Sequence, residues 1–180
     1  MYFERLRLEQ FKPYADVEVS LGPGVTVIHG LNGSGKSSLL EACFLSLYGS
    51  SALDDTLDAV MTTGADATLI ELQLRHRDAP ITIHRELRRR SSGVATTTAT
   101  LEGEHHEIEG TRDIRAHVRE LLRMDVDAFR NCAYVRQGEI NKLIEATPSE
   151  RQRMIDTLLQ LGRLEMYRDR ARSAALAVED

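Results

Sequence analysis

The sequence is poor in cysteine and contains no long apolar run, and both absences narrow the classes of protein it can be. Only two of the 180 residues are cysteine, Cys43 and Cys132, and they share no CxxC spacing. Both lie in apolar surroundings, which indicates reduced core residues of a cytosolic protein. No signal peptide and no apolar run as long as a membrane span are present, so we expect a cytoplasmic chain without a membrane partner.

A strong charge imbalance is missing as well. The formal net charge is -5, and so mild an acidity does not indicate nucleic-acid binding by the chain as a whole. A local basic cluster, Arg85 with Arg88, Arg89 and Arg90, could contact DNA phosphates or could be a solvated strand end. The sequence leaves both readings open.

The most informative stretch is a complete P-loop motif, G-x-x-x-x-G-K-[ST], at residues 30–37. Its glycines let successive backbone N–H groups point into one cavity that holds phosphates. Lys36 brings a positive charge to the β- and γ-phosphates, and the Ser37 hydroxyl is placed to ligate Mg²⁺. We therefore predict a nucleotide and Mg²⁺ site whose cradle is formed by Asn32, Gly33, Ser34, Gly35, Lys36, Ser37 and Ser38.

Both flanks of the motif match its expected context. The β-branched run Val25-Thr26-Val27-Ile28-His29 predicts a buried strand before the loop, and apolar residues at helical spacing predict a helix over 38–48 after it. The alternative reading, an ordinary glycine-rich turn before a helix, is disfavoured because every fixed position of the motif is filled.

The rest of the pattern predicts a mainly antiparallel lobe. Alternation over 2–8 and around Val17 and Val19 predicts two strands before the P-loop. Four more segments predict a meander, at 68–74, 81–87, 95–101 and near 107–108. We expect three further helices. The first is short, is capped by Asp54 or Asp55 and runs through Val60. The second runs from an N-cap at Thr111 to Arg123, and the third covers 125–130.

The C-terminal part predicts a long helix. Thr147-Pro148-Ser149-Glu150 matches a capping box with proline at the first helical position. The last turns are mostly charged residues and alanine, which suits the start of a coiled coil. We therefore predict an ATPase lobe over 1–148 and a long helix, beginning a coiled coil, over 149–180.

Taken together, these motifs resemble the Rad-fifty family, SMC-like ATPases of DNA double-strand-break repair, in its archaeal type. The resemblance covers essentially all 180 residues. It implies an α/β fold: a P-loop NTPase of the ABC/SMC ATPase type, here the N-terminal lobe with an antiparallel β-meander and the root of a coiled coil. The residues that carry it are Phe11-Lys12-Pro13-Tyr14, the cradle residues 32–38, Leu47-Tyr48-Gly49, and above all Tyr134-Val135-Arg136-Gln137-Gly138-Glu139-Ile140.

The resemblance also implies roles for residues outside the P-loop. Gln137 falls in the Q-loop, where its amide oxygen would complete the Mg²⁺ shell and help position the attacking water; judged alone, it could be a polar loop residue. Lys12 matches a basic position beside the nucleotide. Thr62 and Thr63 fall where family members touch the nucleotide from the side, although many members carry a lysine there and this sequence does not.

The motifs of a second ATPase lobe are absent from this sequence: a signature motif, a Walker B acidic pair and a histidine switch. The resemblance therefore implies half of a split ATPase head. Its implied partners are the C-terminal ATPase lobe of the same protein, a second protomer in an ATP-dependent homodimer, an Mre-eleven-type nuclease and double-stranded DNA. Zinc would be bound only at a coiled-coil apex, whose CxxC is absent here. We expect an ATPase that is nearly inactive as a lone lobe, in a cytoplasmic, nucleoid-associated complex.

Two alternatives stay open. An SbcC-like SMC-type nuclease subunit shares the likeness at 11–15, although the string from Arg136 to Ile140 favours the first reading. A truncated nucleotide-binding interaction module, without hydrolysis, would also explain the missing second lobe.

Overall fold

The computed structural model describes residues 1–133 and 147–149, and the chain divides into two compact units, 1–123 and 124–180, which we describe separately. The described part of the first unit is built around a six-stranded sheet in the order β2-β1-β3-β4-β5-β6, antiparallel throughout. The strands are β1 (Tyr2–Phe11), β2 (Tyr14–Ser20), β3 (Ala67–His76), β4 (Ala79–Arg90), β5 (Gly93–Gly103) and β6 (Glu107–Glu109). The helical elements are α1 (Lys36–Tyr48), α2 (Thr111–Leu122) and the 3₁₀ turns η1 (Gly49–Ala52) and η2 (Leu57–Val60).

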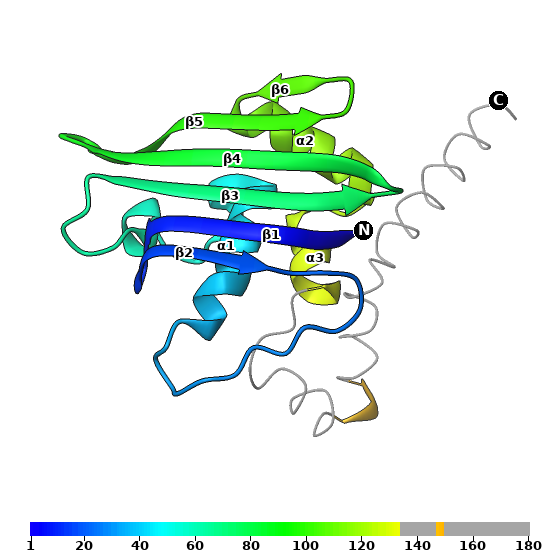
Figure 1. The fold of residues 1–180 in the computed structure, drawn as a ribbon, viewed down its shortest axis with the longest axis horizontal. Coiled ribbons are helices and arrows are strands. Elements are labelled where there is room, and N and C mark those ends of the chain that lie inside the picture. Colours follow the sequence, from blue (N-terminus) through cyan, green and yellow to red (C-terminus); the bar gives the residue numbers. More distant parts are fainter. Residues whose placement is uncertain (134–146, 150–180) are drawn as a thin grey trace, which may run out of the picture. The chain divides into compact units, whose positions relative to one another are not determined.

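One face of this sheet forms the core. Every second residue of β3 from Thr68 to Leu74 is buried, and β4 repeats the pattern from Ile81 to Leu87. Period-two alternation places these side chains on one face. The helices α1 and α2 cover that face, so the unit has two layers (Figure 1).

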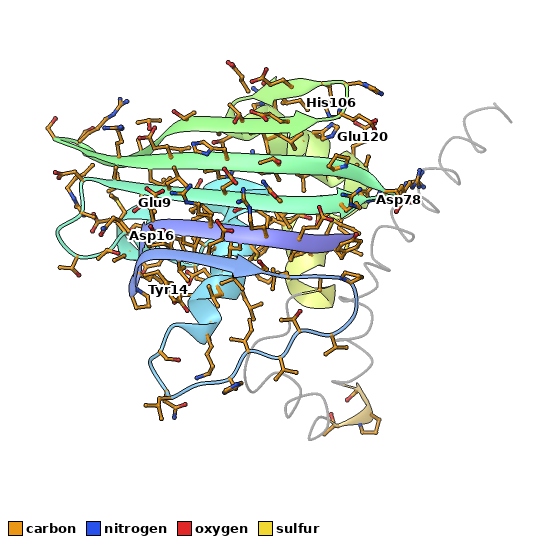
Figure 2. All side chains as sticks on the ribbon, in the orientation of Figure 1. Glu9, Tyr14, Asp16, Asp78, His106 and Glu120 are labelled. Carbon is orange, nitrogen blue, oxygen red and sulfur yellow. The ribbon has the colours of Figure 1, made fainter. Side chains whose placement is uncertain are left out.

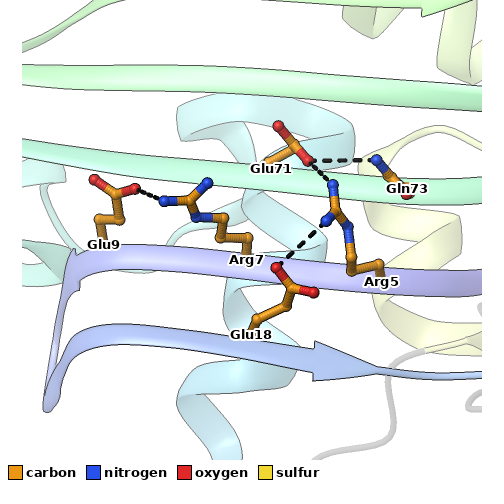
Figure 3. Close-up of polar contacts among 6 residues, drawn as sticks. All are labelled: Arg5, Arg7, Glu9, Glu18, Glu71 and Gln73. Atoms are coloured by element: carbon orange, nitrogen blue, oxygen red, sulfur yellow. Dashed lines mark hydrogen bonds and ion pairs between the residues drawn. The ribbon is translucent and has the colours of Figure 1, made fainter.

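The opposite face of the sheet is polar and carries a ladder of cross-strand ion pairs (Figure 3). Arg5 on β1 donates to Glu18 on β2 at 3.3 Å and to Glu71 on β3 at 2.6 Å, so it joins three strands. Along β1, Arg7 pairs with Glu9. These side chains are roughly a quarter to a half exposed, and each such pair contributes about 0.2–1 kcal/mol. The ladder helps fix the register of β2, β1 and β3.

The β3–β4 hairpin shows why the meander is readable from sequence. Its register runs without a shift from Ala67 opposite Arg88 to His76 opposite Ala79. The two turn residues, Arg77 and Asp78, have φ of 49° and 67°, which matches the backbone of a two-residue type I′ turn. Asp78 marks this end of the hairpin in Figure 2. The four predicted strands of the meander are all confirmed, each with slightly wider bounds.

The predicted strand at 25–29 is wrong. Residues 21–35 form neither strand nor helix, and Val25, Val27 and Leu31 are 93%, 76% and 85% exposed. A β-branched run favours extended backbone, but a strand needs a hydrogen-bonded neighbour. Among the described residues no strand pairs with this run.

Several helix starts also differ from expectation. Thr111 is the first residue of α2 and not its N-cap, a place that Gly110 takes with φ of 92°. The short helix through Val60 is a 3₁₀ turn whose N-cap is Thr56; Asp55 accepts a hydrogen bond from the Thr56 amide instead of capping it. These positions are decided by tertiary contacts that local sequence does not contain.

In the second unit, α3 (Val126–Cys132) confirms the helix predicted over 125–130. The Asp125 carboxylate caps it by accepting a hydrogen bond from the Ala128 amide at 2.9 Å. Pro148 and Ser149 are helical. The predicted division at residue 148 and the coiled-coil helix over 149–180 stay predictions, because residues 150–180 lie outside the described part.

Candidate functional site

The P-loop runs directly into α1, whose first residue is Lys36. Gly33 and Gly35 have φ of 82° and 97°, values that glycine adopts without strain. The loop is tightened by Ser34 N donating to Leu31 O, and the Gly35 carbonyl accepts from the amides of Ser38 and Leu39 at 2.8 and 3.2 Å. No side chain caps the start of α1. Its first amides and its dipole therefore face an uncapped end that favours an anion.

Lys36 holds the loop closed. Its ammonium donates to the carbonyls of Gly30 at 3.0 Å and Leu31 at 2.8 Å. Among the other predicted cradle residues, Asn32, Gly33, Ser34 and Ser37 are exposed, and Gly35 and Ser38 are half-buried. The loop thus presents hydroxyl groups and a cation at the start of a helix, which is the chemistry of a phosphate and Mg²⁺ site.

Lys12 lies in the turn between β1 and β2 and reaches α1. Its ammonium forms an ion pair with the Glu41 carboxylate, and the two side chains are 28% and 26% exposed. Glu41 lies one helical turn after Ser37, so its side chain is on the Ser37 face of α1. The structure therefore brings Lys12 to the helix that begins at the P-loop. Its predicted place beside a nucleotide stays a prediction.

Thr62 and Thr63 precede β3. The Thr62 hydroxyl donates to the Lys12 carbonyl at 2.8 Å, so Thr62 lies against the same turn. Thr62 thus lies beside Lys12, and its hydroxyl is already hydrogen-bonded there. Thr63 is exposed and accessible to a ligand. Gln137 lies outside the described residues, so its predicted role stays a prediction.

Sequence reasoning missed three residues at this site. Glu41 pairs with Lys12, and Pro13 and Tyr14 approach Gly35 closely. The i, i+4 spacing of Ser37 and Glu41 was the one available signal for Glu41. Nothing in the local sequence indicates that the β1–β2 turn reaches the P-loop.

The basic cluster does not form one surface. Arg85 is fully buried on the core face of β4, where its Nε donates to Ser46 O at 2.8 Å and its Nη1 to Thr111 Oγ1 at 3.1 Å. Burial lowers the pKa of Arg85 to about 10. Arg85 is therefore a core residue, so neither of the two readings left open for the cluster, a DNA contact or a solvated strand end, holds for this residue. At the end of the strand, Arg88 pairs with Glu86 and Arg89 with Asp58.

The described residues lack two further kinds of feature. None of their helices is long and apolar enough to cross a membrane. Within the same residues, no group of three or more histidine, cysteine or acidic side chains could hold a metal ion.

A two-layer α/β lobe with a P-loop at the start of its first helix defines a P-loop nucleotide-binding lobe of the ABC/SMC ATPase type. Residues 5–175 match the family model described as an AAA domain, and the chain belongs to this family.

Similar curated proteins carry a more specific name. The chain is 57% identical, over its whole length, to "DNA double-strand break repair Rad50 ATPase" of Halobacterium salinarum. It is 45% identical over 99% of its length to proteins of the same name from Methanosarcina acetivorans and Methanosarcina mazei. It spans 20% of the first protein and 17% of the other two. These matches confirm the resemblance to the Rad-fifty family.

Solved structures support the fold alone. The SMC head domain from Thermotoga maritima is 23% identical with a TM-score of 0.54, and the match covers 82% of this chain and 52% of that one. The recombination mediator protein RecF with ATP is 18% identical with a TM-score of 0.52, and the match covers 87% of this chain and 37% of that one. Both confirm the predicted fold class.

Proposed function

We propose that this chain is the N-terminal half of an ATPase head, which binds ATP and Mg²⁺ and hydrolyses ATP once a C-terminal ATPase lobe and a second protomer complete it. The observation that carries the proposal is the complete P-loop at the uncapped start of α1. The 57% identity to a protein named as a Rad50 ATPase of DNA double-strand-break repair supports the reaction and the process.

The roles of the residues follow from their positions. Lys36 would exchange the carbonyls of Gly30 and Leu31 for the β- and γ-phosphates, and the loop amides would hold the remaining phosphate oxygens. Ser37 would ligate Mg²⁺, with Gln137 completing its shell and orienting the attacking water. Lys12 would add charge beside the nucleotide, and Thr62 and Thr63 would flank it from the side.

The exposed run at 25–29 supports the C-terminal lobe as a partner. Val25 and Val27 are β-branched residues of the kind found in central strands, but they are exposed here. Exposed apolar side chains in one stretch mark an interaction site. A strand from the other lobe, hydrogen-bonded to this run, would bury them and would position the P-loop from its N-terminal side.

The partners of the assembled protein belong to the same proposal. Two completed heads would hold two ATP molecules between them. Their engagement and release would control the access of an Mre-eleven-type nuclease to double-stranded DNA. Such a complex would act in the cytoplasm, at the nucleoid. An SbcC-like subunit is less favoured, because the relatives described above are named as Rad50 ATPases.

The test is Mg²⁺-dependent ATP turnover by the 180-residue chain, alone and with the separately expressed C-terminal lobe. Turnover only in the mixture, lost with Lys36→Ala, is the expected result, since hydrolysis needs groups that this lobe lacks. Equal turnover with and without the second lobe would refute the split head. ATP binding without turnover in either case would favour the alternative, a nucleotide-binding interaction module.

A further inference from the structure

The turn between β1 and β2 has a strained backbone. Gln10, close to the end of β1, and Lys12, in the turn itself, have φ of 53° and 49°, in the left-handed region that residues other than glycine rarely adopt. Such a conformation persists only where the surroundings determine it, and it is concentrated at functional sites. The turn is therefore held in this shape by contacts from outside it.

Those contacts come from β3 and the segment that leads into it. The Gln10 carbonyl accepts from Thr62 N at 2.9 Å and from the Thr68 hydroxyl at 2.7 Å. The Lys12 amide donates to Val60 O at 2.8 Å, and the Lys12 carbonyl accepts a hydrogen bond from the Thr62 hydroxyl. Four hydrogen bonds thus fix the two residues of left-handed backbone on either side of the fully buried Phe11.

The tip of the turn rests on the P-loop. A Cβ atom added to Gly35 would lie 2.7 Å from the Tyr14 Oη and 2.8 Å from the Pro13 Cγ, closer than real Cβ atoms come to their neighbours. Gly35 therefore allows an approach that alanine would block, besides its positive φ. Figure 2 shows Tyr14 beside the N-terminal end of α1.

A second tie joins the same turn to α1. The Lys12–Glu41 ion pair links it to the helix just beyond Ser37, and both side chains are about three-quarters buried. The turn thus contacts the P-loop at Gly35 and the first turns of α1 at Glu41. The turn therefore touches both the end of the phosphate loop and the helix that follows it.

We propose that the β1–β2 turn is a brace that sets the geometry of the phosphate loop, with Tyr14 as the positioning residue against Gly35 and Glu41 as its anchor on α1. The proposal rests on the nucleotide site proposed above and adds residues to it. A loop held by these contacts keeps its amides oriented towards an incoming phosphate, which reduces the entropy lost on binding. Burial raises the pKa of the Tyr14 phenol, so the ring stays neutral at the edge of an anion site.

The first test needs no nucleotide. Amide hydrogen exchange of the 180-residue chain is followed at Ser38 and Leu39, which both donate to the Gly35 carbonyl. Tyr14→Ala should raise their exchange rates about tenfold, whereas Tyr14→Phe, which keeps the ring, should leave them within about twofold. The Ile114 amide in α2 serves as an internal control for global unfolding. Unchanged exchange at Ser38 and Leu39 in Tyr14→Ala would overturn the brace.

The second test measures the Kd for Mg-ATP by calorimetry. Tyr14→Ala should weaken binding about tenfold and Tyr14→Phe less than twofold, a separation that loss of stability alone would not give. A Tyr14→Phe variant as weak as Tyr14→Ala would make the hydroxyl a ligand and overturn the positioning role.

A second variant covers the case in which Tyr14→Ala fails to fold. Glu41→Gln then replaces it in both tests, and both the exchange rates and the Kd should change about threefold. No effect of Glu41→Gln would count against the brace. A wild-type chain that binds no nucleotide would refute the proposed function, while the exchange experiment would still decide on the brace.

Discussion

A buried guanidinium without a carboxylate partner is the most unusual residue of the first unit. Arg85 is 0% exposed, and its Nη2 has no hydrogen-bond partner. Its Nε donates to Ser46 O, close to the C-terminal end of α1, where a cation is favoured by the helix dipole. Arg85 thus joins β4 to the end of α1 and, through Thr111, to the start of α2.

We predict that Arg85→Ala destabilises the chain by about 2–4 kcal/mol, because it removes hydrogen bonds from the buried Ser46 carbonyl and the half-buried Thr111 hydroxyl and leaves a cavity. Arg85→Met should recover part of this loss, since its stem fills the space. Urea denaturation followed by circular dichroism measures the change. Arg88→Ala is the matched control; its side chain is 58% exposed, so a change within about 0.5 kcal/mol is expected. Equal stability of Arg85→Ala and wild type would contradict this assignment.

Cys43 should be almost unreactive in the folded chain. It is 6% exposed, and burial raises the pKa of its thiol to about 12. With this pKa the thiolate fraction at pH 8 is about 10⁻⁴, and only the thiolate reacts. The alkylation rate should rise about tenfold per pH unit from pH 7 to pH 10, whereas an ordinary thiol levels off above a pKa of about 8.5. Peptide mapping after iodoacetamide treatment, with a urea-denatured sample as control, measures this. Rapid labelling of native Cys43 would show that the thiol is accessible.

At the scale of single elements, the accuracy of sequence reasoning depended on where the partners of an element lie in the chain. The meander from β3 to β6 was predictable because each strand pairs with its neighbour in sequence and its alternation reports the buried face. The strand at 25–29 was predicted from composition alone and is not formed. The sequence predicts Thr111 as an N-cap, but its hydroxyl accepts a hydrogen bond from Arg85 instead.

The same argument applies to the site. The P-loop residues were identified from their spacing, because phosphate binding there depends on local backbone geometry. Tyr14 and Glu41 were missed, because their importance comes from contacts with Gly35 and Lys12, far away in sequence. No local pattern in the sequence contains those contacts.

The exposed run at 25–29 gives a prediction at the scale of one element. Val27→Asp should leave the stability of the isolated chain within about 0.5 kcal/mol, because the side chain is 76% exposed. In the proposed head, the same charge would be buried in a central strand, so affinity for the C-terminal lobe should fall at least about tenfold. Val27→Thr, which keeps the branched shape, is the matched control. Denaturation and calorimetry with the purified lobe measure the two effects. A strongly destabilised Val27→Asp chain would place this residue in a core that the structure does not show.

At the scale of the whole molecule, the chain is a small part of the proteins it resembles. It spans 20% of the length of its relative from Halobacterium salinarum. The described residues supply a phosphate cradle, a sheet that supports it and a brace, but the groups that position water and complete the sandwich would come from other segments. Nucleotide binding and nucleotide hydrolysis are therefore separable properties in the proposed assembly.

This separation predicts how the assembly responds to ATP. The 180-residue chain alone should remain monomeric with Mg-ATP, because in the proposed head the signature motif that contacts the nucleotide of a second protomer would come from the C-terminal lobe. Mixed with the C-terminal lobe, it should dimerise in the presence of Mg-ATP and dissociate when ATP is removed. A ligand that binds the dimer more tightly than the monomer shifts the equilibrium towards the dimer. Sedimentation velocity distinguishes the species. Lys36→Ala should abolish dimerisation while leaving the association of the two lobes intact, since Lys36 would contact the phosphates in the proposed site and lies outside the run from 25 to 29. ATP-dependent dimers of the chain alone would mean that it already contains the complete contact surface.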